Sequence, residues 1–319
     1  MRSGEPVWLV GDIGATNARF GLMSSRRALL HHRIFACEEH PTIEDALALY
    51  LDECGEWPMP RIGALAIASA IAGDRVTMTN HPWSFSIATL CARLGFERLE
   101  VINDFTAVAL ALPHLGAEDR LAVGGGSPAA GAPLAVLGAG SGLGVSGLIP
   151  AGDRWIPLTG EGGHATMAPA DGRESAVLDH LRRQFDHVSA ERLLSGPGLV
   201  NIYRSLAALA GVPARGYTAA EITDPATGAA DPLCRDSTDL FCAMLGTMAG
   251  NLALILGARG GVYIAGGIAP RLGRRFLTSP FRERFEAKGR MRSYLAAIPT
   301  YLVVHPFPAF VGCAALLAD

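Results

Sequence analysis

The chain has 319 residues, half of them hydrophobic and 18% charged, with a formal net charge of −3. This length suffices for two domains or one large domain, and the apolar content can fill a sizeable core. Without a basic field, nucleic acid is not expected as a main partner. The six cysteines contain no CxxC pair, so neither a zinc site nor a disulfide framework is indicated. Reduced thiols in a cytoplasmic protein are the simplest interpretation.

No targeting or membrane segment is predicted. Residues 1–5 do not resemble a signal peptide and lead directly into a strand. The longest uncharged run, 121–152, is rich in Gly, Pro and Ala and has no sustained apolar stretch, so it predicts loops and strands instead of a membrane span.

The first predicted element is a β-hairpin. A buried strand over 6–10 leads into Gly-Asp-Ile-Gly-Ala-Thr-Asn at 11–17, and a second strand follows over 18–23. Gly, Thr and Asn favour a tight turn, whose backbone N–H groups can form an anion nest. Asp12 cannot bind a phosphate itself, but it could hold a hydrated Mg²⁺ that does. The alternative is an ordinary hairpin with a solvated Asp12.

The following stretch predicts an α/β unit with a mixed sheet. The expected elements are a strand over 29–36, a helix opened by Thr42, strands over 61–69 and 76–80, and a helix that Ser86 caps and that ends at Leu94.

Two polar residues then separate a strand from a helix. Asn103 and Asp104 follow the buried strand 99–102 and precede a helix over 105–112, which stops at Pro113. A carboxylate at the carboxyl end of such a strand faces the ligand crevice of an open α/β sheet. Asp104 could accept a proton from a substrate hydroxyl, and Asn103 could exchange hydrogen bonds with the same ligand. On this stretch alone, a simple helix cap at Asp104 is the favoured alternative.

The order of strand, Gly-rich turn and strand recurs roughly 125 residues later. Strands over 134–137 and 145–149 flank Gly-Ala-Gly-Ser-Gly-Leu-Gly at 138–144. This repeat suggests two related domains facing each other across a cleft. It would place one phosphate hairpin at each end of a transferred phosphoryl group.

Two nucleotide-binding motifs are excluded. Gly142, Gly144 and Gly147 satisfy G-x-G-x-x-G, but no helix can follow them directly as a dinucleotide fingerprint requires. The single lysine, Lys288, is followed by Gly289, so the chain has no P-loop.

Two further residues, Glu161 and His164, could contact a polar ligand. Glu161 and His164 lie three apart in a Gly-rich loop, which suits hydrogen bonding to a polyol better than metal binding, because no third ligand is evident. A solvated loop is the alternative. Glu191 is expected in the first turn of a helix capped near Ser189, where the helix dipole alone would favour a carboxylate.

The rest of the chain predicts mainly helices, with a second Gly pair. The strand over 262–265 ends in Gly266 and Gly267, where a base or ribose could lie against the backbone. The other expected elements are helices over 174–185, 199–210 and 239–256, a surface helix within 271–292, a strand over 301–304, and an apolar helix over 310–318 that returns to the first domain.

Taken together, these motifs resemble those of the bacterial ATP-dependent glucokinases, within the hexokinase/actin-like ATPase superfamily. The resemblance covers nearly the whole chain, and the motifs are highly specific in combination and order. The matching stretches are LVGDIGATNARFGL at 9–22, MTNHPWSFSI at 78–87, LEVINDFTAV at 99–108, GAGSGLGV at 138–145, GEGGH at 160–164, HVSAERLLSGPGLVN at 187–201 and GGVYIAGGIAPR at 260–271.

The resemblance implies two RNase H-like α/β domains flanking a cleft, one covering 1–113 plus about 304–319 and the other 114–303. It also implies transfer of the ATP γ-phosphoryl group to the 6-hydroxyl of glucose, with Mg²⁺, as in glycolysis. Asp104 would be the catalytic base. The implied glucose ligands are Asn103, Asp104, Glu161, His164 and Glu191. The implied ATP contacts are Gly11, Asp12, Ile13, Gly14, Ala15, Thr16, Asn17, Gly140, Ser141, Gly142, Gly266 and Gly267, with Asp12 near Mg²⁺ through water.

Three residues depart from the family pattern. Ser141 replaces a common Thr and keeps the hydroxyl, and Ala70 replaces a common Pro. Ala15 matters most, because it stands where the first hairpin usually has a second Gly. If that position needs a positive φ, Ala is strained by on the order of 1 kcal/mol, which would slow ATP use.

Two other functions stay open at this point. One is a kinase for another hexose, such as mannose or N-acetylglucosamine. The other is a non-catalytic sugar sensor, disfavoured because the hairpin begins by Gly11 and leaves no room for an N-terminal helix-turn-helix. The sequence does not fix the phosphoryl donor, which could be ATP, ADP or polyphosphate, and a homodimer is implied by the resemblance alone.

Overall fold

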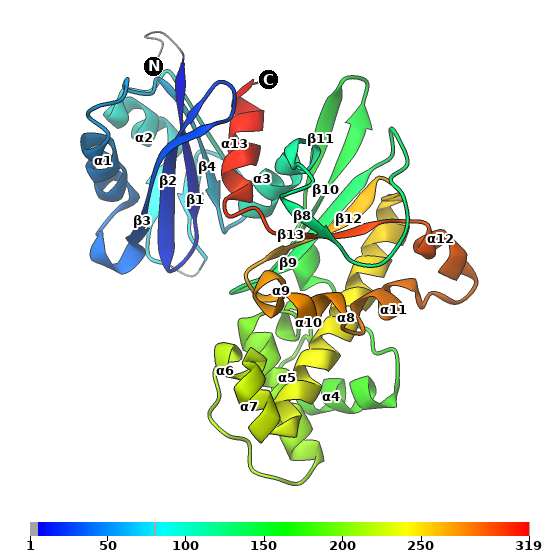
Figure 1. Cartoon of the computed structure of the whole chain (residues 1–319). Helices are drawn as coiled ribbons and strands as arrows, with labels where there is room; N and C mark the ends of the chain where they lie inside the picture. Colours follow the sequence, from blue (N-terminus) through cyan, green and yellow to red (C-terminus); the bar gives the residue numbers. More distant parts are fainter. Residues whose placement is uncertain (1–5, 80, 319) are drawn as a thin grey trace. The chain divides into compact units, whose positions relative to one another are not determined.

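The computed structural model describes residues 6–79 and 81–318, which belong to two compact units (Figure 1). Unit 1 comprises Met1–Leu115 and His305–Asp319, and unit 2 comprises Gly116–Val304. Each unit has its own mixed β-sheet and its own hydrophobic core. The predicted α/β fold class is therefore confirmed.

Unit 1 contains a five-stranded sheet in the order β3-β2-β1-β4-β7. Strand β1 pairs antiparallel with β2 and parallel with β4, and β4 pairs parallel with β7. The five strands are β1 Val7–Ile13, β2 Asn17–Ser24, β3 Leu29–Ala36, β4 Ile62–Ile67 and β7 Arg98–Asn103. A separate hairpin pairs β5 Arg75–Thr77 with β6 Ser84–Ser86.

Helices cover both faces of this sheet. Helices α1 (Ile43–Glu53) and α2 (Ile87–Leu94) share a core with alternate residues of the strands, among them Phe20 and Leu22. Gly21, between them, faces the opposite side because successive strand residues alternate. There a Cβ on Gly21 would meet the ring of Phe310 at 2.8 Å, and Phe310 belongs to α13 (Pro308–Ala318).

The C-terminal helix α13 packs closely on α3 (Asp104–Ala111), as Figure 1 shows. A Cβ on Gly312 would lie 1.7 Å from the carbonyl oxygen of Ala107, so only Gly allows this approach. Helix α13 thus packs against the helix that begins at Asp104 and supports it.

Two predicted helix caps of unit 1 are confirmed. The Thr42 hydroxyl accepts the N–H of Asp45 at 3.1 Å, and the Ser86 hydroxyl accepts the N–H of Thr89 at 3.1 Å. These bonds satisfy N–H groups that the first turn of a helix leaves without intrahelical partners.

Unit 2 contains a six-stranded sheet in the order β11-β10-β9-β12-β13-β8. Its central strands β9, β12 and β13 are parallel, and β10, β11 and β8 add antiparallel edges. The strands are β8 Arg120–Ala122, β9 Leu134–Ala139, β10 Leu143–Ala151, β11 Arg154–Thr159, β12 Gly261–Gly266 and β13 Thr300–Val303.

Nine α-helices are described in unit 2, of which α8 is the longest. They are α4 Gly172–Arg182, α5 Gly196–Leu209, α6 Ala219–Thr223, α7 Pro225–Ala230, α8 Pro232–Leu256, α9 Ile268–Leu272, α10 Arg274–Leu277, α11 Phe281–Glu286 and α12 Arg292–Ala296. The described residues of both units also form five 3₁₀ turns: η1 Cys37–Glu39, η2 Leu112–His114, η3 Gly162–His164, η4 Ala190–Arg192 and η5 Gly289–Met291.

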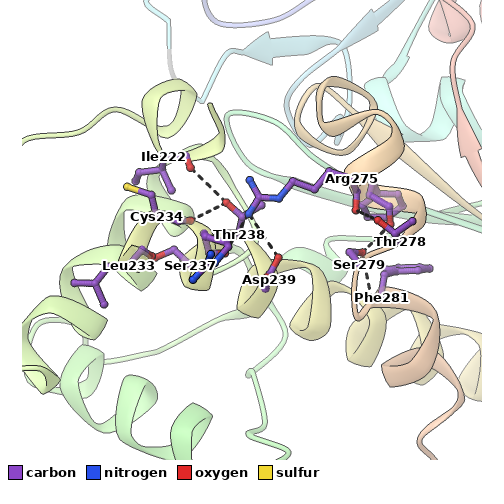
Figure 2. A network of polar contacts seen from close by, with 12 residues as sticks. Ile222, Leu233, Cys234, Ser237, Thr238, Asp239, Arg275, Thr278, Ser279 and Phe281 are labelled. Atoms are coloured by element: carbon purple, nitrogen blue, oxygen red, sulfur yellow. Dashed lines mark hydrogen bonds and ion pairs between the residues drawn. The ribbon is translucent and has the colours of Figure 1, made fainter. Parts of the chain in front are cut away.

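Helix α8 is tied to its neighbours by polar contacts (Figure 2). The Thr238 hydroxyl donates to the carbonyl of Cys234 at 2.9 Å and lies 3.4 Å from that of Ile222 in α6. Asp239, the next residue, forms an ion pair with Arg275 of α10 at 3.6 Å. Among the described helices, α8 alone is long and apolar enough to cross a membrane by length and composition, and 61% of that stretch is buried within the structure.

Several predicted boundaries in unit 2 are wrong. The surface helix expected within 271–292 is divided into short pieces, and Gly273, with φ +53°, ends the first of them, α9. The helix expected around Glu191 is a single 3₁₀ turn, and the Ser189 side chain does not cap it. Strand β8 was missed because it has only three residues.

In unit 1 the main correction concerns the first hairpin. Strand β1 continues through Gly11, Asp12 and Ile13, so the turn is shorter than the predicted span of 11–17. The strand predicted over 76–80 is also shorter, since β5 ends at Thr77, and Asn80 lies outside the described residues.

Candidate active site

The turn of the first hairpin, in unit 1, has only two residues, Ala15 and Thr16. The N–H of Gly14 donates to the carbonyl of Asn17 at 3.0 Å and closes it. Among the non-glycine residues of the described chain only Arg27 has a positive φ, so Ala15 is not strained. The expected penalty at Ala15 is therefore wrong, because this turn has no left-handed position for Gly to fill.

The carbonyl and N–H groups of this turn differ in their partners. The carbonyl oxygens of Gly14 and Thr16 accept hydrogen bonds from Cys37. Within residues 6–79 and 81–318, no hydrogen bond is formed by the N–H groups of Ala15 and Thr16, which lie at the partly exposed tip. Two N–H groups without acceptors at a turn are suited to bind an anion.

Asp12 supplies the negative charge of this hairpin. It lies directly opposite Arg19 in the register of β1 and β2, and the two side chains form an ion pair at 3.1 Å. Burial raises the pKa of Asp12 above its ordinary value, and the neighbouring Arg19 guanidinium opposes that rise. The sequence analysis missed Arg19, although a two-residue turn at Ala15 and Thr16 sets this pairing.

The surroundings of Asp12 suit a hydrated Mg²⁺ ion better than an ion that is held entirely by protein side chains. No group of three His, Cys, Asp or Glu side chains that could hold a metal exists among the described residues. Mg²⁺ commonly takes one or two carboxylates and completes its octahedron with water and substrate phosphates. The Asp12 side chain is 29% exposed, so a hydrated ion can approach it.

The second feature of unit 1 is the junction of β7 and α3. Asn103, not Asp104, is the N-cap of α3: its Oδ1 accepts the N–H of Phe105 at 2.9 Å and of Thr106 at 3.1 Å. Its Nδ2 lies 3.4 Å from the carbonyl of Ser69. The cap interpretation of Asp104 is thus wrong.

Asp104 is the first residue of α3, and its side chain is half-buried. Its Oδ1 accepts the N–H of Phe105 at 2.8 Å. A carboxylate at this position interacts favourably with the helix dipole. Asn103 caps the helix, and Asp104 places its carboxylate in the first turn.

In unit 2, Leu143 brings three predicted parts of the site together. Its N–H donates to Oε2 of Glu191 at 2.8 Å, which fixes that carboxylate beside the turn between β9 and β10. Its carbonyl lies under the loop at 160–164, where a Cβ on Gly163 would approach it to 2.1 Å. Glu161 and His164 of that loop are exposed and joined by a hydrogen bond of 3.0 Å from the His164 N–H to the Glu161 carbonyl.

The turn between β9 and β10 is Gly140, Ser141 and Gly142. The N–H of Gly140 donates to the carbonyl of Gly142, and the Gly140 carbonyl accepts the N–H of Gly196 at the start of α5, both at 2.8 Å. A Cβ on Gly142 would lie 2.4 Å from Oε2 of Glu191, so the absence of a side chain leaves room for that carboxylate.

The Gly pair that ends β12 lies beside the same turn. Gly266 has φ +81°, and the N–H of Gly267 donates to the carbonyl of Ala139 at 3.0 Å. In the adjacent strand, a Cβ on Gly138 would lie 2.4 Å from the carbonyl carbon of Ala265. Unit 2 therefore gathers Gly140–Gly142, Glu161, His164, Glu191 and Gly266–Gly267 at one end of its sheet.

Sequence reasoning did not identify Cys37 or Leu143. No sequence pattern around Cys37 indicated a functional role, because its contact with the first turn forms only when β3 returns the chain alongside β2. Leu143 acts through its backbone, which no side-chain pattern reveals.

The sequence profile of the glucokinase family matches residues 9–319. A glucokinase of Paramagnetospirillum magneticum is 54% identical over 98% of this chain and 97% of its own length. The crystal structure of a glucokinase from an Antarctic psychrotroph has a TM-score of 0.87 and 35% identity, covering 98% of each chain. A ROK family glucokinase from Streptomyces griseus, solved in complex with glucose and AMPPNP, has 19% identity over 97% of this chain and 98% of its own, and a TM-score of 0.67 that supports the shared fold.

Proposed function

Because the chain belongs to the glucokinase family, we propose that it transfers the γ-phosphoryl group of ATP to the 6-hydroxyl of glucose, with Asp104 as the general base. The assignment of Asp104 as the general base rests on the positions of Asn103 and Asp104 at the start of α3. Asn103 caps the helix, and Asp104, the first helical residue, places a half-buried carboxylate at the carboxyl end of β7.

Glucose is the substrate that best suits the polar groups of the two units. Asn103 and Asp104 in unit 1, and Glu161, His164 and Glu191 in unit 2, offer carboxylate, amide and imidazole groups. Such groups accept from or donate to sugar hydroxyls. Glu191 is already oriented by the Leu143 N–H, so it would meet a hydroxyl with little loss of side-chain entropy.

Phosphoryl transfer depends mainly on positioning and electrostatic stabilisation. Asp104 would accept the proton of the 6-hydroxyl as the hydroxyl oxygen attacks the γ-phosphorus, the bond from the γ-phosphorus to the β–γ bridging oxygen breaks, and ADP leaves. The N–H groups of Ala15 and Thr16 would offset charge on the phosphate oxygens. Asp12 would hold Mg²⁺ through water, and the ion would neutralise charge on the phosphates when bound.

The turn at Gly140–Gly142 would also contact the phosphates, and Gly266 and Gly267 would lie against the adenosine. The absence of side chains at these glycines permits close approach of a ligand to the backbone. The exclusion of water during transfer would prevent loss of the phosphoryl group to hydrolysis.

The test is Asp104→Asn, which keeps the size of the side chain and removes its basicity. We expect kcat to fall by at least ~10², as for loss of a general base, while glucose binding measured by calorimetry persists. Asp52→Asn, on the exposed face of α1 in the same unit, is the matched control and should leave kcat unchanged. Near-normal kcat in Asp104→Asn would remove Asp104 from this role.

A kinase for another hexose is the second candidate. The comparison that supports it is the breadth of sugar kinases on this fold, which include an N-acetylmannosamine kinase-like protein of Listeria monocytogenes at 17% identity and a TM-score of 0.64. Turnover with each hexose at equal concentration separates the two candidates.

A further inference from the structure

Cys37 contacts the first turn through two separate groups. It is the first residue of η1, directly after β3, and its side chain is fully buried. Its N–H donates to the carbonyl of Thr16 at 2.9 Å, and its Sγ donates to the carbonyl of Gly14 at 3.4 Å. One residue therefore holds the carbonyls on both sides of Ala15.

The bond to Gly14 has a consequence for Ala15, because the two residues share one planar peptide unit. In a trans peptide the C=O and the following N–H point in opposite directions. The Gly14 carbonyl faces the Cys37 thiol, so the N–H of Ala15 is directed away from the thiol and the core around it. That N–H has no acceptor in the part of the chain that the structure describes.

We propose that Cys37 is a positioning residue for phosphoryl transfer: its thiol fixes the Gly14–Ala15 peptide so that the Ala15 N–H is directed at a phosphate of ATP. This inference rests on the proposed function of the first hairpin. It also accounts for how this turn keeps a defined direction, since the bond comes from outside the turn.

The chemistry of the thiol agrees with a donor role. Burial raises the pKa of Cys37, so the thiol stays protonated at neutral pH and can donate. A thiol is a weak hydrogen-bond donor, but the Cys37 side chain is long enough to reach the Gly14 carbonyl from η1. Serine would supply a stronger donor with a shorter reach.

The test compares Cys37→Ala and Cys37→Ser with Cys54→Ala in the full chain. Cys54 is also buried, belongs to the same core cluster, and contacts His31 instead of the turn. We expect Cys37→Ala to raise the KM for Mg-ATP by about 3- to 10-fold while the KM for glucose stays within about twofold, because a hydrogen bond of about 1 kcal/mol positions only the phosphate contact. Cys37→Ser should recover most of the loss, and Cys54→Ala should lower thermal stability without changing the KM for Mg-ATP.

A second measurement uses the unmodified chain, in case Cys37→Ala does not fold. The backbone amide NMR signal of Ala15 should shift on addition of Mg-AMPPNP. An unmoved Ala15 signal, or an equal change of the Mg-ATP KM in Cys54→Ala, would overturn the inference alone. Failure of the unmodified chain to phosphorylate glucose with ATP would overturn the proposed function and this inference with it.

Discussion

The two hairpins share an order of strand, Gly-containing turn and strand, but different interactions hold them. The turn of the first hairpin is fixed by hydrogen bonds from Cys37, tolerates Ala at its tip, and has no positive φ at Ala15. In the turn of the second hairpin, at Gly140–Gly142, a Cβ on Gly142 would lie 2.4 Å from the Glu191 carboxylate, and in the adjacent strand a Cβ on Gly138 would lie 2.4 Å from the backbone of Ala265. Two similar sequence motifs thus depend on different features: the first turn on hydrogen bonds from Cys37, and the second hairpin on glycines that lack a Cβ.

This difference predicts where substitutions are tolerated. Open space surrounds the tip of the first turn, since a Cβ on Gly14 would meet its nearest neighbour at 3.7 Å. Around the second turn, added Cβ atoms on Gly138, Gly142 and Gly163 would come within 2.4 Å of other atoms. Real Cβ atoms do not make such contacts, so the neighbouring backbone or side chain must move.

The largest difference concerns the source of negative charge: Asp12 belongs to a strand of the first hairpin, whereas Glu191, the carboxylate beside the second turn, belongs to η4. Asp12→Asn should lower kcat/KM for Mg-ATP by about 10- to 100-fold, as for loss of an outer-sphere metal contact, without changing glucose binding. Steady-state kinetics over a Mg²⁺ titration measures this. An unchanged Mg²⁺ dependence would show that Asp12 only pairs with Arg19.

The second prediction addresses the packing around the second hairpin. Gly163→Ala should destabilise unit 2 by about 1–3 kcal/mol, because its Cβ would clash with the Leu143 carbonyl, and should lower kcat/KM for glucose about tenfold. Gly160→Ala in the same loop is the control, since nothing lies within 4 Å of its added Cβ. Equal effects of the two substitutions on thermal unfolding and kinetics would contradict the packing argument.

The smallest effect is expected at the tip of the first turn. Ala15→Gly should leave the KM for Mg-ATP within about twofold and lower stability by about 0.5–1 kcal/mol, because Gly gains freedom in the unfolded chain and relieves no strain here. Thermal unfolding and ATP titration check both parts. A large gain in ATP affinity would show that this position requires the conformational freedom of Gly.

Local patterns predicted much of this architecture. Strand β3 has its predicted span, the caps at Thr42 and Ser86 follow from capping chemistry, and all three are confirmed. The ion pair of Asp12 with Arg19 could also have been predicted from the sequence, because the turn length fixes which residues face each other across a hairpin.

Other features depend on contacts between distant segments, which one sequence does not specify. The Cys37 bonds need β3 to return beside β2, and the close approach of Gly163 needs its loop to lie on β10. The cap at the start of α3 was assigned to Asp104 because two neighbouring residues can both cap a helix, and only the backbone geometry of Asn103 decides between them.

The most direct test of the central claim is an assay of ADP release by the unmodified chain with Mg-ATP and a panel of hexoses. The account predicts strong, saturable turnover with glucose and weaker turnover with mannose and N-acetylglucosamine. Such a result would also show that Ala15 is compatible with ATP use. Absence of turnover with glucose, in a preparation that binds glucose, would contradict the account.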